Sequence, residues 1–145
     1  MQPLPHHYVV ASAGGPEGDV SLTSDGLPAL SSAPPAAFGG PGDRWSPETL
    51  LTAAIADCFI LTFRAVARAA KLEWVSLRCE VEGTLDRVER VTHFTSFLVR
   101  ASLKVPAGAN EEEARRALER AEHACLITSS LKGSSRLEAT VEVAL

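Results

Sequence analysis

The alternation of apolar and polar residues along the chain predicts mainly strands. Between residues 75 and 83, and again between 93 and 105, apolar and polar residues alternate, which is typical of a strand with one buried face. Shorter apolar runs near the N-terminus are divided by glycine-containing turns. The predicted strands cover residues 8–12, 19–23, 27–31, 75–83, 93–105 and 137–143.

Two stretches have helical spacing instead. Ser46 is a suitable cap and Pro47 suits the first position of a helix that is expected to run to about Lys71. Apolar residues nearly encircle this segment, so we expect a buried central helix. The second helix begins at Asn110, and its apolar residues recur every three or four positions as far as Cys125.

The order of these elements favours an α+β fold. The alternation predicts antiparallel sheets with one solvated face, and the two helices are expected to pack on the other face. The loop 33–43 is rich in proline and glycine, but the part before it is too small to bury a core of its own. We therefore expect one domain over residues 1–145.

Charge and composition narrow the range of partners. The 145 residues carry 14 Lys and Arg against 18 Asp and Glu, a net charge of -4. No basic excess is available to neutralise phosphates, so nucleic-acid binding is not expected. The longest apolar run, 50–63, is too short to cross a bilayer, and it contains Asp57. We expect no membrane span, no signal peptide and a cytoplasmic location.

The three cysteines carry the candidate chemistry. Cys58 lies in the middle of the first predicted helix, and Cys125 lies on the apolar stripe of the second. These two thiols meet if the helices cross there, but both also suit a core position, where free cysteines are common. Cys79 lies on the apolar face of a predicted strand and is expected to be structural. An odd number of cysteines argues against a secreted disulfide framework.

Metal and nucleotide sites are not expected. The chain has no Cys-x-x-Cys pair, and its four histidines lack ligand spacing. The glycine-rich segment 39–42 precedes a helix, but Pro41 removes a backbone donor and no lysine follows as in a phosphate loop. We therefore expect neither a metal ion nor another cofactor.

The segment 46–59, SPETLLTAAIADCF, resembles the signature of the OsmC/Ohr family of thiol peroxidases. In that pattern, Pro-Glu is followed by an apolar helix and by a cysteine at the spacing of Glu48 and Cys58. The family's second cysteine ends a later helix, as Cys125 does before a polar turn. The resemblance covers essentially the whole chain.

The resemblance implies an intertwined homodimer with two sites at the subunit interface. It also implies that Cys58 attacks a hydroperoxide and becomes a sulfenic acid, which condenses with Cys125 to a disulfide. A thiol or dithiol reductant then restores both cysteines. Only the thiolate is a good nucleophile, and burial raises the pKa of a thiol, so Cys58 needs a nearby cation or hydrogen-bond donor.

Two positions depart from the family pattern. The hydroperoxide-resistance branch has arginine where this chain has Pro16, and the family usually has proline where this chain has Leu126. Arg44 is the nearest substitute cation by sequence, and we expect Glu48 to hold it. Ten residues of helix span about 15 Å, so Glu48 does not reach Cys58 of its own chain and otherwise serves the partner subunit. A solvated loop arginine and a first-turn acid are the alternative interpretations of these two residues.

Two functions are consistent with these features. One is a cysteine-based peroxidase acting on organic hydroperoxides. The alternative is a non-catalytic protein of the same fold that binds a small apolar ligand. Phe38 and Trp45, in the loop before the first helix, suit either function as walls of an apolar pocket. Thiol chemistry at Cys58 separates the two.

Overall fold

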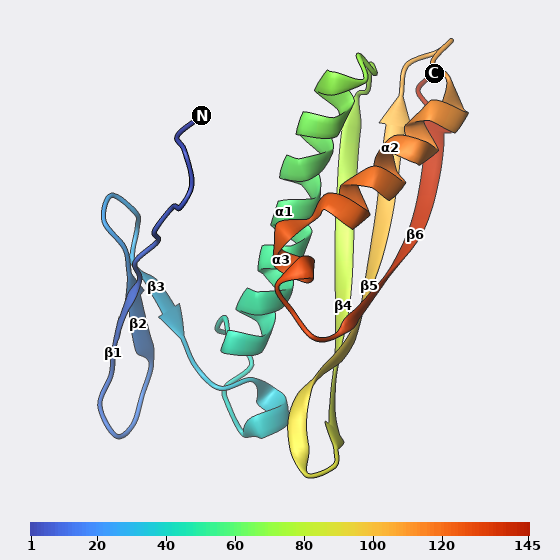
Figure 1. Ribbon diagram of the computed structural model, residues 1–145. Helices are drawn as coiled ribbons and strands as arrows, with labels where there is room; N and C mark the ends of the chain where they lie inside the picture. Colours follow the sequence, from blue (N-terminus) through green and yellow to red (C-terminus); the bar gives the residue numbers. More distant parts are fainter. The chain divides into compact units, whose positions relative to one another are not determined.

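The computed structural model describes residues 1–145, which form two compact units, Met1–Leu50 and Leu51–Leu145. Their helices and strands confirm the α+β class (Figure 1). In chain order the elements are β1 (Ala11–Ala13), β2 (Val20–Thr23), β3 (Leu30–Ser32), the 3-10 helix η1 (Ala36–Phe38), α1 (Pro47–Ala69), β4 (Ser76–Val88), β5 (Val91–Val105), α2 (Glu111–Ala124), α3 (Leu126–Ser129) and β6 (Ser134–Val143).

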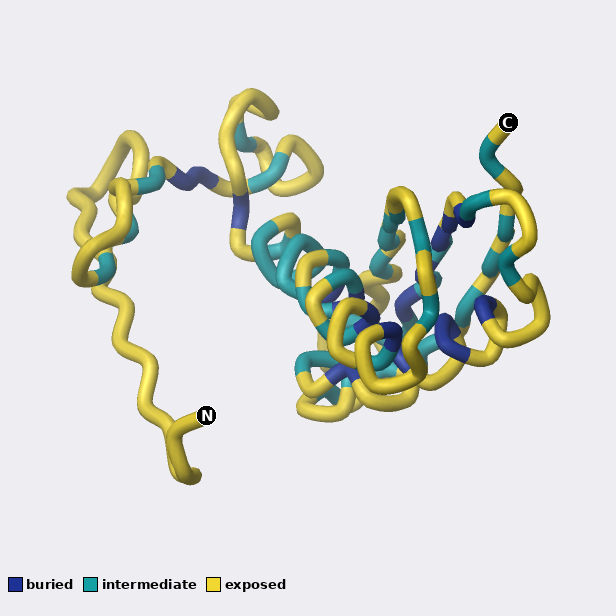
Figure 2. Tube along the Cα trace, turned by 90° about the horizontal axis from the view of Figure 1, so that it is seen from above, coloured by how far each residue is buried: buried dark blue, intermediate teal, exposed yellow.

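The N-terminal unit is a small antiparallel sheet with almost no core. Its strands run in the order β1-β2-β3, and a bridge joins Ser32 to Trp45 beyond the loop. The backbone N–H of Ala33 donates to the Trp45 carbonyl at 2.9 Å, which closes that loop. Most residues of this unit are exposed, as Figure 2 shows for the chain near the N-terminus. This unit therefore leaves apolar side chains uncovered.

The start of α1 is capped as predicted. The Thr49 N–H donates to Ser46 Oγ at 3.1 Å, and the Ser46 N–H donates to Thr49 Oγ1 at 2.8 Å. Such reciprocal bonds satisfy two donors that a helix end otherwise leaves unpaired. The helix ends at Ala69, slightly before the predicted Lys71, which has a left-handed φ of 54°.

The second sheet is mixed, so the expectation of purely antiparallel sheets is wrong. Its order is β4-β5-β6; β4 pairs antiparallel with β5, whereas β5 pairs parallel with β6. The cause is the connection: α2 carries the chain back along the sheet between β5 and β6, and such a helical crossover returns the next strand in the same direction. Apolar and polar residues alternate in either kind of pair, so the pattern alone did not separate them.

The β4–β5 hairpin is longer than the sequence indicated. The predicted strands ended at residue 83 and resumed at residue 93, but Asp86 pairs with His93 and strand pairing continues to Val88. Only Glu89 and Arg90 form the turn, with φ values of 50° and 69°. Two left-handed residues make a tight two-residue hairpin whose twist matches that of the strands, which lets the ladder run to its end.

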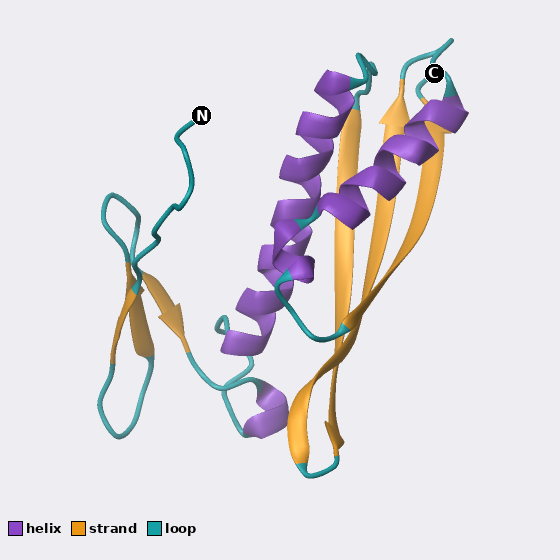
Figure 3. Cartoon of the chain, in the orientation of Figure 1, coloured by secondary structure: helices purple, strands orange, loops and turns teal.

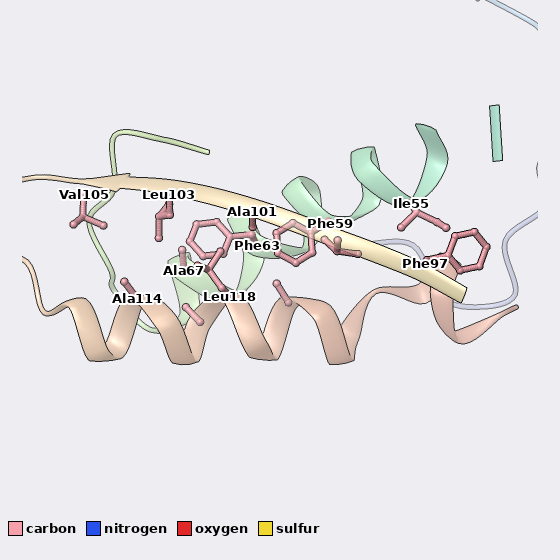
Figure 4. Packing of buried hydrophobic residues seen from close by; sticks show 13 residues of the cluster. Ile55, Phe59, Phe63, Ala67, Phe97, Ala101, Leu103, Val105, Ala114 and Leu118 are labelled. Atoms are coloured by element: carbon pink, nitrogen blue, oxygen red, sulfur yellow. The ribbon is translucent and has the colours of Figure 1, made fainter. Parts of the chain in front are cut away.

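The core of the C-terminal unit lies between the sheet and the two long helices (Figure 3). From α1 it receives side chains spaced one turn apart, and from α2 a stripe of alanines with Leu118. Figure 4 shows these residues meeting the inward side chains of β5. The fully buried members include Ile55, Phe59, Phe63, Ala67, Phe97, Val99, Leu103, Val105 and Leu118.

Only one face of α1 is buried within the chain, which corrects the expectation of a helix covered all round. Leu61, on the other side, is 52% exposed. By length and composition alone α1 also meets the requirements of a membrane-crossing helix, with a mean hydropathy of 1.8. Its buried residues pack against β5 and α2, however, which is the arrangement of a core helix.

Candidate functional site

Cys58 lies at the margin of the buried face of α1. The neighbouring Phe59 is 1% exposed and points into the core, whereas Cys58 is only partly buried. Its helical position therefore leaves the sulfur within reach of both the protein interior and an incoming molecule.

Cys125 lies at the junction of α2 and α3. Its backbone is extended, with φ -62° and ψ 109°, so the helix breaks there and restarts as the short α3 beside α1 (Figure 1). The Cys125 side chain is buried, with 2% exposure. The thiol nevertheless reaches Cys58, to whose sulfur it forms a hydrogen bond. The structure thus brings together two cysteines that the sequence placed on separate helices.

Four donors surround the Cys58 sulfur. The hydroxyl of Thr62, one helical turn further along α1, lies 3.6 Å from Sγ. The backbone N–H groups of Ile127 and Leu126, at the start of α3, also donate to it, together with the Cys125 thiol. No side-chain cation is among these contacts.

These donors determine how readily Cys58 ionises. Burial raises the pKa of the Cys58 thiol, but hydrogen bonds from the Ile127 N–H, the Thr62 hydroxyl, the Cys125 thiol and the Leu126 N–H lower it, and together they outweigh burial. The pKa is therefore below its ordinary value. A larger fraction of Cys58 is thiolate at neutral pH, which is the form that reacts with electrophiles.

Cys79 has the opposite character. It lies on the core side of β4, where burial, with a smaller contribution from the charge of Cys125, raises the pKa of its thiol to about 11. At neutral pH it stays protonated and is a poor nucleophile. Although Cys79 lies near Cys125, its chemistry separates it from the Cys58 pair.

Arg44 and Glu48, the two further candidates, belong to the N-terminal unit. Arg44 Nε donates to Asp19 at 2.9 Å, and its Nη1 lies 3.2 Å from a carboxylate oxygen of Asp43. These two acids fix the guanidinium; neither was suggested by the sequence. Glu48 lies in the first turn of α1, where an acid is favoured by the helix dipole.

An open hollow surrounds Arg44 in the same unit. Its volume is about 420 Å³, and Trp45 contributes the one aromatic wall. Phe38, the other expected wall residue, does not line it and is 61% exposed. The remaining lining comes from Ser31, Gly42, Asp43 and Thr49.

No metal centre is formed by the side chains of residues 1–145. They contain no group of three or more His, Cys, Asp and Glu residues placed to hold an ion.

The donors on Cys58 other than Cys125 are the part of the site that the sequence did not reveal. Leu126 and Ile127 act through their backbones, which carry no residue-type signal. Thr62 was visible as a neighbour of Cys58, because residues four apart lie on one helix face. The signal that could have identified Thr62 is a hydroxyl side chain four residues after the candidate thiolate Cys58.

Comparison with known proteins identifies relatives over almost the whole chain. A family model described as OsmC-like protein matches residues 40–140. The uncharacterized protein YmaD of Bacillus subtilis is 27% identical over 143 residues, which is 97% of this chain and 95% of YmaD.

Solved structures share the fold. An OsmC-like protein of unknown function from Vibrio cholerae has a TM-score of 0.86 and 14% identity, covering 94% of this chain and 100% of that one. An organic hydroperoxide resistance protein from Legionella pneumophila has a TM-score of 0.75 and 27% identity, with 97% and 100% covered. One from Elizabethkingia anophelis has a TM-score of 0.78 and 22% identity, with 99% and 100% covered.

Proposed function

The chain belongs to the OsmC-like family, and on this premise we propose that it is a cysteine-based peroxidase that reduces organic hydroperoxides. One observation carries the proposal: a partly exposed thiol with a lowered pKa, Cys58, is hydrogen-bonded to a buried second thiol, Cys125. Similar structures described as organic hydroperoxide resistance proteins support it.

The proposed reaction begins at Cys58. Its thiolate attacks the terminal oxygen of the hydroperoxide, and the O–O bond breaks. The alkoxide leaves and takes up a proton from solvent to give an alcohol, while Cys58 becomes a sulfenic acid. The contacts on Sγ favour this step because they raise the share of thiolate.

Cys125 completes the oxidative half of the cycle. Its sulfur attacks the sulfenic sulfur of Cys58, the S–O bond breaks, and a water molecule leaves as a disulfide forms. Two thiol groups of a reductant, from one dithiol or two monothiols, then return two electrons. The reductant attacks Cys58, because Cys125 is buried. Free thiols suit a reducing compartment, which favours a cytoplasmic location.

Arg44 and Glu48, which belong to the N-terminal unit, are the remaining residues of the proposed site. Arg44 is held by Asp19 and Asp43, so its guanidinium is oriented and available to favour a negatively charged group. The Arg44→Ala variant is expected to slow oxidation of Cys58 at neutral pH, and Arg44→Lys restores only part because lysine lacks the planar two-point contact.

The active form is proposed to be a homodimer. Leu61 on α1 and Val9, Val10 and Leu27 of the N-terminal unit are apolar and exposed within one chain. Large exposed apolar side chains, here present on each of the two units, are typical of surfaces that another chain covers. We propose a second copy of the chain as the partner, because it is present in every solution of this protein.

The alternative, a binding protein without catalysis, is separated by thiol chemistry. Stopped-flow measurement of free thiol after addition of an alkyl hydroperoxide tests the peroxidase directly. We expect rapid loss in the wild type and in the control Cys79→Ser, none in Cys58→Ser, and a slower reaction with hydrogen peroxide. Unchanged thiol in the wild type refutes the peroxidase and leaves ligand binding as the function.

A further inference from the structure

The turn after Cys125 carries three successive hydroxyl side chains, all directed at backbone carbonyls. We propose that Thr128, Ser129 and Ser130 are positioning residues that aim the Leu126 and Ile127 N–H groups at the Cys58 sulfur. The inference rests on the proposed function of Cys58 and identifies what prepares that residue for reaction.

The first carbonyl held in this way is that of Cys125. It accepts the Ser129 hydroxyl at 2.6 Å and the Thr128 hydroxyl at 3.1 Å. The Ser129 backbone N–H also donates to it, at 3.1 Å. One carbonyl oxygen with three donors has little freedom to rotate.

The second carbonyl is that of Leu126, which accepts the Ser130 hydroxyl at 2.7 Å. These short bonds reach back three or four residues, the usual geometry of serine and threonine in a helical turn. In this chain they are needed, because α3 has only 4 residues and a helix so short does not sustain itself.

Peptide geometry links each carbonyl to one of the N–H groups on Cys58. The Cys125 carbonyl and the Leu126 N–H belong to one peptide group, and the Leu126 carbonyl and the Ile127 N–H to the next. In a planar trans peptide the C=O bond and the N–H bond point in opposite directions. Holding both carbonyls on the side of the hydroxyls therefore directs both N–H groups toward the Cys58 sulfur, to which they donate.

The same bonds strengthen the donors as well as orienting them. A carbonyl that accepts hydrogen bonds polarises its peptide group, so the attached N–H becomes a better donor. The Cys125 carbonyl, with three donors, is the stronger case. The hydroxyl turn thus does by dipoles what a neighbouring cation does by charge.

The test is the pH dependence of Cys58 alkylation by iodoacetamide, measured peptide by peptide. Cleavage after Lys and Arg places the cysteines on separate peptides, Trp45–Arg64, Cys79–Arg87 and Ala121–Lys132. The midpoint of Cys58 alkylation is expected to rise by about half a pH unit or more in Ser129→Ala and in Ser130→Ala. Ser102→Ala, on an exposed strand position, is the matched control and leaves the midpoint unchanged.

A variant that lacks one backbone N–H tests whether the Ser129 hydroxyl acts through the Leu126 N–H. Leu126→Pro removes one N–H but keeps the Cys125 carbonyl, and Cys125 already has the extended ψ that precedes proline. It is expected to raise the midpoint by about one pH unit. Because Ser129 acts through the same peptide group, the double variant with Ser129→Ala then rises by less than the sum of the two shifts.

Two results overturn the inference: an unmoved midpoint in both serine variants with circular dichroism like the wild type, or fully additive shifts in the double variant. Rescue by Ser129→Thr, which restores a hydroxyl, supports it. Alkylation needs no peroxide, so its outcome is independent of the proposed peroxidase. Absence of peroxide consumption in the wild type refutes that function and leaves the role of the turn in thiolate formation standing.

Discussion

Thr62 Oγ1 lies 3.6 Å from Cys58 Sγ, one helical turn further along α1. When Cys58 is ionised its sulfur only accepts hydrogen bonds, so the Thr62 hydroxyl is the donor. This bond lowers the pKa of Cys58 against the effect of burial, which raises it. A residue of the same helix therefore contributes to thiolate formation without any change of fold.

Replacing this hydroxyl is expected to make Cys58 harder to ionise. Thr62→Val keeps the branched shape and removes the donor, so the pKa of Cys58 rises by about one unit. Its alkylation and peroxide oxidation at neutral pH then slow by up to about tenfold, since rate follows thiolate fraction. Thr62→Ser retains the donor and stays near the wild type. Equal midpoints in Thr62→Val and the wild type exclude this role.

Cys79 is expected to stay outside the reaction. With the pKa of its thiol raised to about 11, only about one molecule in ten thousand carries a Cys79 thiolate at pH 7. In the native protein its peptide is alkylated appreciably only above pH 10 or so, because ionisation begins near the raised pKa. The Cys79→Ser variant consumes peroxide at the wild-type rate. Rapid labelling of native Cys79 at neutral pH contradicts this assignment.

The core should be sensitive at α2. Leu118 is fully buried beneath the sheet, and Leu118→Ala is expected to lower the free energy of unfolding by about 2–5 kcal/mol. The adjacent exposed Glu119 is the control, and Glu119→Ala changes it by less than about 0.5 kcal/mol. Urea unfolding at one protein concentration and under reducing conditions measures both. Similar losses in the two variants contradict the described packing.

Assembly is expected to depend on the open face of α1. Light scattering should give twice the chain mass of 15.4 kDa at micromolar concentration. Leu61, 52% exposed in one chain, is the point to test. Leu61→Asp places a charge on this apolar face and is expected to shift the protein toward the monomer, whereas Glu119→Ala remains dimeric. A stable wild-type monomer refutes the homodimer.

Much of the local structure could be predicted from the sequence. Ser46 and Pro47 located the start of α1, because capping and a fixed φ are properties of the residues themselves. The alternation of apolar and polar residues located β4 and β5, because this pattern is also a property of the residues themselves. The parallel pairing of β6 was missed, since strand direction depends on the path of the connecting helix and not on the strand's residues.

The site was predictable only in part. Cys58 and Cys125 stood out by residue type and position, and the structure places their thiols in contact. Their neighbours did not stand out: two donors are backbone N–H groups, and any residue except proline offers one. The ion pair between Arg44 and Asp19 was not predictable either, because the two residues are far apart in the sequence and only folding brings them together.

Disulfide mapping after treatment with one equivalent of an alkyl hydroperoxide measures directly whether Cys58 and Cys125 react as proposed. We predict a link between Trp45–Arg64 and Ala121–Lys132, the peptides that hold Cys58 and Cys125. In Cys125→Ala the same treatment should leave Cys58 as a sulfenic acid that dimedone traps. A main product that contains Cys79, or no oxidation of Cys58 in either protein, contradicts the proposed reaction of Cys58 with Cys125.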